Sequence, residues 1–148
     1  MRLQIDPKKD IKDACESNNY FTAFALASSY FEYEANLIFG TRFENRISLK
    51  KIGRWSLQTK IRLLFGLNML DHSTYEKISE IIKIRNKLVH PVNIWENGKK
   101  GEKGRMRDIF LSYRLTEREK SSLLSFNECY SKLMEVHSRT LDEKSRRQ

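Results

Sequence analysis

Residues 73–91, STYEKISEIIKIRNKLVHP, are the stretch from which the fold of this chain is most directly predicted. At about 100° per residue, its apolar side chains fall on one broad arc of a helix. They are Ile78, Ile81, Ile82, Ile84, Leu88 and Val89. The opposite arc carries polar and charged side chains: Glu76, Ser79, Glu80, Lys83 and Lys87. The pattern predicts an amphipathic helix over 73–89 that buries one face and begins with a Ser73–Glu76 capping box.

Arg85 interrupts the apolar arc near its middle, where an aliphatic residue would normally lie. Burying a lone charge is strongly unfavourable, so this arginine needs a carboxylate, a subunit boundary or a phosphate. His90 lies at the helix end on the edge of the same arc, close enough to share a cleft with Arg85. Pro91 disfavours helical geometry at the preceding residue, which places His90 at the C-terminal cap. The negative end of the helix dipole favours the imidazolium form there.

Each of these residues has an ordinary structural explanation, as an ion-pair partner and as a helix cap. The whole string Arg85-Asn86-Lys87-Leu88-Val89-His90, however, resembles the R-N-x-x-x-H signature of the HEPN superfamily (higher eukaryotes and prokaryotes nucleotide-binding). The flanking segments KIRLLFGL (60–67) and IIKIRNKLVHP (81–91) are similar to the central part of mannitol-operon-repressor-like and related HEPN families. The resemblance covers about residues 55–92, and the preceding helix fits more weakly.

The resemblance implies a single domain over 1–148, folded as an all-α, antiparallel bundle of four to five helices. Many HEPN domains are metal-independent ribonucleases, in which two motif helices meet across a homodimer. Arg85 and His90 would then be catalytic, and Asn86 would orient the arginine or the substrate. Glu34, which borders the buried stripe of an earlier helix, is expected to pair with Arg85 in the resting state.

The chemistry of these residue types suits RNA cleavage without a metal. The reaction needs a base for the 2′-hydroxyl proton, an acid for the 5′-oxygen and positive charge on the phosphate. The planar guanidinium of Arg85 matches phosphate oxygens, and His90 titrates near neutral pH and can act as acid or base. One Arg–His pair supplies too few proton-transfer groups for both ends of the reaction, which favours a site shared by two chains.

Composition limits the remaining classes. The chain has 148 residues, of which 39% are hydrophobic and 32% charged, as expected for one small soluble helical domain. Membrane-spanning and signal-peptide segments are not expected. Cys15 and Cys129 are far apart in sequence and match no metal-ligand spacing, which predicts reduced thiols in a cytoplasmic protein without a metal or cofactor.

The net charge of +9 is unevenly distributed. Residues 98–107 contain five basic residues, one acidic residue and three of the six glycines. Such a segment suits a mobile arm that follows a phosphate backbone, with Lys99, Lys100, Lys103 and Arg105 as RNA-binding residues. A solvated loop explains it equally well. The surrounding stretch, about 92–111, is expected to be either a flexible excursion or a small β-hairpin.

Helical periodicity predicts three further helices. The first covers about 10–39, with a break near Asn18–Asn19, an end at Gly40 and a buried stripe. That stripe contains Phe21, Phe24, Ala27, Ser28, Phe31, Ala35 and Ile38. After a linking region (42–54) with room for a short helix, Ser56 caps a second helix that stops at Gly66. Its inner residues are Leu57, Ile61, Leu64 and Phe65.

The last helix is expected over about 116–144, opening with a Thr116–Glu119 capping box. Its inner face contains Leu123, Phe126, Tyr130, Leu133, His137 and Leu141. His137 is interpreted as a core or interface histidine, and His72 as a surface residue.

Three functional hypotheses follow. The first is an endoribonuclease, as a toxin or defence effector with an antitoxin or nucleotidyltransferase partner. The second is a catalytically silent HEPN domain that acts as a transcriptional regulator or partner-binding module of the mannitol-repressor-like kind. The third, a basic DNA-binding protein, is weaker because the motif helix lacks a helix-turn-helix pattern.

Overall fold

All regular structure in the described part of the chain is helical, which confirms the predicted all-α class. The computed structural model describes residues 5–43, 48–89 and 115–147. The expected excursion at 92–111 therefore lies outside the described residues. The elements are α1 (Pro7–Glu16), α2 (Tyr20–Arg42), α3 (Leu49–Ile52), α4 (Leu57–Gly66), α5 (His72–Val89), α8 (Glu117–Ser121), the 3₁₀ helix η1 (Ser122–Ser125) and α9 (Phe126–Arg147).

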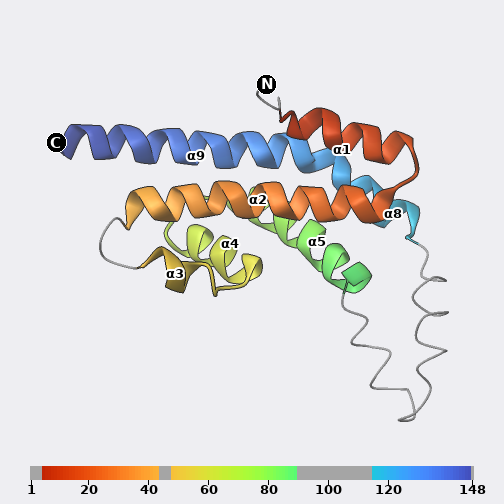
Figure 1. Cartoon of the computed structure of the whole chain (residues 1–148), viewed down its shortest axis with the longest axis horizontal. Coiled ribbons are helices and arrows are strands. Elements are labelled where there is room, and N and C mark those ends of the chain that lie inside the picture. Colours follow the sequence, from red (N-terminus) through yellow and green to blue (C-terminus); the bar gives the residue numbers. More distant parts are fainter. Residues whose placement is uncertain (1–4, 44–47, 90–114, 148) are drawn as a thin grey trace, which may run out of the picture.

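Helix α2 is the centre of the molecule and packs against α1, α3, α4, α5 and α9. In the view of Figure 1, α1 and α9 are drawn above α2 and α3, α4 and α5 below it, while α5 also packs directly against α9. A helix that carries apolar residues on several sides is typically buried on several sides. The fully buried set in α2 comprises Ala23, Phe24, Ala27, Phe31, Ala35, Ile38 and Phe39. Burying each phenylalanine stabilises the fold by roughly 1.5–3 kcal/mol.

The boundaries of α2 confirm one prediction and correct two. The expected break is present: Asn18 has a positive φ of 56°, and the Asn19 side chain caps α2 by accepting a hydrogen bond from the Thr22 amide. Gly40 does not end the helix, which continues to Arg42. Stacking of Phe43 on Phe39 makes a longer helix favourable. Phe21, predicted to be in the buried stripe, is 49% exposed, because the buried positions of α2 begin at Ala23 and Phe24.

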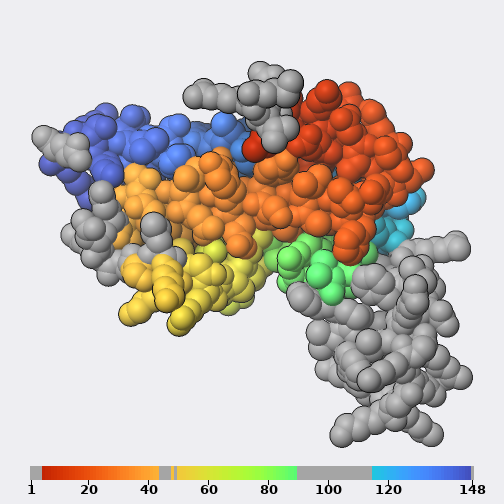
Figure 2. Space-filling model, in the orientation of Figure 1, coloured from red at the N-terminus to blue at the C-terminus, as the bar shows by residue number. Residues whose placement is uncertain are grey.

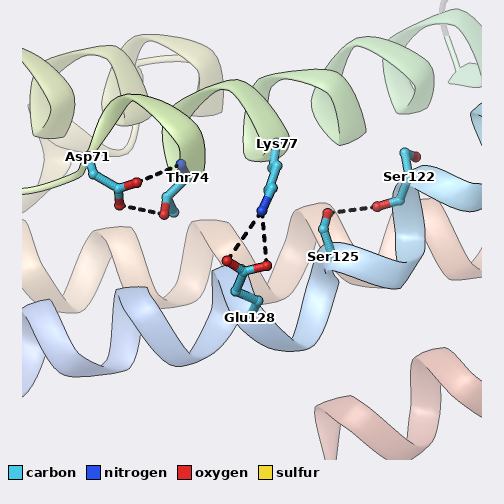
Figure 3. Close-up of polar contacts among 6 residues, drawn as sticks. All are labelled: Asp71, Thr74, Lys77, Ser122, Ser125 and Glu128. Atoms are coloured by element: carbon cyan, nitrogen blue, oxygen red, sulfur yellow. Dashed lines mark hydrogen bonds and ion pairs between the residues drawn. The ribbon is translucent and has the colours of Figure 1, made fainter.

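Helices α3 and α4 form as predicted, but the start of α5 is capped by a different residue from the one predicted. A short helix occupies the linking region, and Ser56 caps α4. The predicted Ser73–Glu76 capping box is wrong. Instead, Asp71 accepts hydrogen bonds from the Thr74 amide (3.2 Å) and the Thr74 hydroxyl (2.6 Å), as Figure 3 shows. A carboxylate competes well for this position because the N-terminal end of a helix attracts negative charge. These bonds lower the pKa of Asp71.

The C-terminal segment is divided where one helix was expected. The Thr116–Glu119 capping box is present as predicted, but η1 separates α8 from α9. Phe126, Tyr130 and Leu133 are buried against α2 and its neighbours, whereas Leu141 is 45% exposed. The buried face continues through Val136 and Thr140, and Arg42 of α2 reaches Glu143 at 3.1 Å, so Leu141 is exposed because it lies beside the buried face, not beyond it.

Lys60, on α4, is the least expected member of the core. Its side chain is completely buried, and its Nζ atom has no hydrogen-bond partner. The Oε1 atom of Glu32, on α2, lies 3.8 Å from Nζ, and the Glu32 side chain is 46% exposed. The ammonium group therefore has a nearby counter-charge but no direct hydrogen bond, an arrangement that costs folding free energy.

Replacing Lys60 with methionine should stabilise the protein, because methionine fills a similar volume without a buried charge. We expect the free energy of unfolding to rise by about 1–2 kcal/mol and Tm by a few degrees. Glu32→Gln should destabilise the protein by removing the counter-charge. Urea and thermal denaturation would measure both variants. Lower stability for Lys60→Met would contradict this account of the buried amine.

Alkaline pH should destabilise the protein through Cys129. Burial raises the pKa of its thiol to about 11, whereas in an unfolded chain the thiol ionises near pH 8.5. From about pH 9 to 11, the unfolded chain loses a proton that the folded chain keeps, so stability falls as pH rises. Urea titrations at several pH values should show a shallower fall for Cys129→Ala. An unchanged pH dependence in this variant would exclude the thiol as the cause.

Candidate functional site

Arg85 lies in the last part of α5, at the rim of the buried face of the helix. Ile81 and Ile84 are buried, whereas Arg85 and Leu88 are only half-buried. The arginine therefore extends from a well-packed part of the core towards the surface. Its position near the C-terminal end of the helix also suits a cation, because the helix dipole is negative there.

The guanidinium of Arg85 is held by its neighbour in sequence. Its Nη1 atom donates a hydrogen bond of 3.0 Å to the Oδ1 atom of Asn86. Its Nε atom is buried without a hydrogen-bond partner. Among the described residues, no carboxylate lies within ion-pair distance of Arg85. The Asn86 contact is the one expected for a residue that orients the arginine, and the guanidinium keeps donors for an anion.

The expected Glu34–Arg85 pair is not formed. Glu34 is 5% exposed, and its Oε1 atom accepts a hydrogen bond of 3.2 Å from the Tyr130 hydroxyl. Its Oε2 atom lies 3.8 Å from Nδ1 of His137. Both partners come from α9, so Glu34 faces the α2–α9 contact rather than α5. Sequence position indicated that Glu34 points inward, but not which helix it meets.

The Glu34 cluster joins α2 to α9. Burial, followed by the charge and hydrogen bond of Glu34, raises the pKa of Tyr130 to about 12. The Tyr130 hydroxyl therefore keeps its proton, and its hydrogen bond to Glu34, above the pH at which a free tyrosine ionises. The half-buried His137 occupies the core-edge position that its place on the predicted inner face indicated. This cluster is a structural contact separate from Arg85.

The other predicted site residues cannot be placed. His90 follows Val89, the last residue of α5, and lies outside the described residues. Lys99, Lys100, Lys103 and Arg105 do so as well. Of the predicted site residues within the described ranges, the structure brings Arg85 and Asn86 together and separates both from Glu34.

Two searches limited to 5–43, 48–89 and 115–147 gave negative results. Those ranges contain no group of three or more His, Cys, Asp or Glu side chains that could hold a metal ion. They also contain no helix with the length and apolar character needed to cross a membrane.

Comparison with known proteins found no matching family model, no matching curated protein and no matching solved structure.

Proposed function

We propose that this protein is a metal-independent endoribonuclease whose site combines Arg85 and His90 from two copies of the chain. The observation that carries the proposal is the state of Arg85: half-buried, anchored by Asn86 and without a carboxylate partner in the described part of the chain. An arginine in this state suits a bound phosphate, because its planar fork makes charge-assisted bonds to phosphate oxygens. The R-N-x-x-x-H string, which resembles the HEPN signature, supports the same function.

In the proposed reaction, the RNA 2′-oxygen attacks the adjacent phosphorus as a base removes its proton. The bond from phosphorus to the 5′-oxygen breaks, and an acid gives a proton to that oxygen. His90 residues from the two chains would be the base and the acid. Arg85 would stabilise the negative charge that builds up on the phosphate. The products are a 2′,3′-cyclic phosphate and a free 5′-hydroxyl.

A homodimer is required by this mechanism. Light scattering at micromolar concentration should give twice the chain mass of 17.6 kDa. A two-fold contact between α5 helices would bring the two guanidinium groups near each other around one anionic ligand. A single-chain mass across the micromolar range would contradict the shared site.

Cleavage should depend on Arg85 and His90. We expect His90→Ala and Arg85→Ala each to lower the cleavage rate by about 10²-fold or more. Arg85→Lys should also be impaired, because an ammonium group cannot reproduce the fork contact. The assay is the cutting of mixed RNAs in excess chelator, with analysis of the RNA ends for 2′,3′-cyclic phosphate.

Two matched variants control this experiment. Lys87→Ala removes an exposed cation two residues from Arg85, and His72→Ala removes an exposed histidine at the other end of α5. Both should cleave like the wild type. If the wild-type chain cuts no RNA, or His90→Ala cuts equally well, the catalytic proposal fails. The silent regulatory module, with a protein partner in place of RNA, then replaces it.

A further inference from the structure

A second cationic surface lies on α3 and α4, separate from residues 98–107. No acidic residue occurs from position 45 to position 70, a span that contains six basic residues. Four of them are exposed in the structure, on α3, on α4 and in the turn between them. We call them the α3–α4 basic surface: Lys50, Lys51, Arg54 and Arg62.

No carboxylate among the described residues lies within ion-pair distance of these four cations. Some basic side chains elsewhere have acidic partners on the same or a neighbouring helix. Examples are Lys12–Glu16, Arg42–Glu143, Lys77–Glu128, Lys120–Glu117 and Arg139–Glu135. Lys50, Lys51 and Arg54 lie within five consecutive residues, and exposed like charges at this spacing repel one another, an arrangement that an anionic partner would relieve.

The surface lies on the same scaffold as Arg85. Helices α3 and α4 are on the side of α2 away from α1 and α9 (Figure 1), and in the space-filling view they form one lobe beneath α2 (Figure 2). Helix α4 packs directly on α5, where Gln58 donates a hydrogen bond of 3.2 Å to Ser79. Ser79 precedes Arg85 by six residues, or about 9 Å along a helix axis.

We propose that the α3–α4 basic surface binds the phosphate backbone of single-stranded RNA and leads the strand to Arg85. This inference rests on the proposed ribonuclease function and names how its substrate is held. The cations are spread over two short helices, as suits an extended polyanion rather than one compact anion. Leu63 of α4 and Leu67 directly after it are also exposed, so binding to anionic lipid vesicles is the alternative that the test must distinguish.

The test compares two variants in the full-length His90→Ala chain, which should bind RNA without cutting it. One variant replaces Lys50, Lys51, Arg54 and Arg62 with glutamine. The control replaces Lys8, Lys9, Arg146 and Arg147, which are exposed on α1 and α9, so the same charge is lost elsewhere. Fluorescence anisotropy with labelled polyuridine, over a salt series, gives the affinity and its salt dependence.

If all four side chains contact phosphates, the slope of log affinity against log salt should become shallower by about 3 in the first variant. Raising the salt concentration from 50 to 200 mM lowers RNA affinity in both chains. The factor by which affinity falls would then be about 50 times smaller in this variant than in the parent chain. The control should keep a slope close to that of the parent. Circular dichroism should show both variants folded.

Two results would overturn the inference. One is an equal change of slope in the two variants, which would show a general charge effect. The other is an unchanged slope in the first variant. If that variant also loses binding to phosphatidylserine vesicles, the surface binds lipid and not RNA. Cleavage by the wild-type chain is measured separately. If the wild-type chain cuts RNA but the salt slope of the first variant is unchanged, the enzyme proposal stands and the binding surface fails. If the slope becomes shallower but the wild-type chain cuts no RNA, only the binding surface stands.

Discussion

The burial of α2 on several sides is the constraint on which the rest of the structure depends. A polar group on the buried sides of this helix can gain hydrogen bonds or ion pairs only from neighbouring helices, because water has little access to it. Glu34 finds Tyr130 and His137 on α9, and Glu32 lies near the buried amine of Lys60 on α4. Ser28 and Asn36 each keep a buried oxygen atom without a hydrogen bond. The central helix thus joins the two halves of the domain through polar groups as well as through its phenylalanines.

The same packing produces the state of Arg85. Helix α5 places its isoleucines against the core, so a residue at the end of the buried face is half in the protein and half in water. Glu34 is turned towards α9 and does not neutralise this arginine, which instead contacts Asn86. A cation that is anchored but not neutralised favours an anion, and this is the physical basis of the ribonuclease proposal.

The distribution of charge supports a polyanionic substrate. A net charge of +9 alone would not indicate a binding site, since many basic proteins carry their charge evenly. Here, Lys12, Lys77 and Arg139 are paired with carboxylates, whereas Arg85 and the α3–α4 basic surface have none within the described ranges. Helix α4, which carries Arg62, packs on α5, which carries Arg85, so the two proposals place strand binding and cleavage on adjoining helices.

Sequence alone determined the features that depend on neighbours within one helical turn. Periodicity predicted the helices and the apolar face of α5, the break near Asn18–Asn19 was predicted within the first of them, and Ser56 predicted the start of α4. The Arg85–Asn86 contact also joins sequence neighbours. Tertiary packing decided the rest: the extension of α2 past Gly40, the burial of Lys60 and the partner of Glu34, which lies 96 residues away at Tyr130. The reason is that periodicity shows which side of a helix is buried, whereas the helix that covers this side follows from the packing of the whole chain.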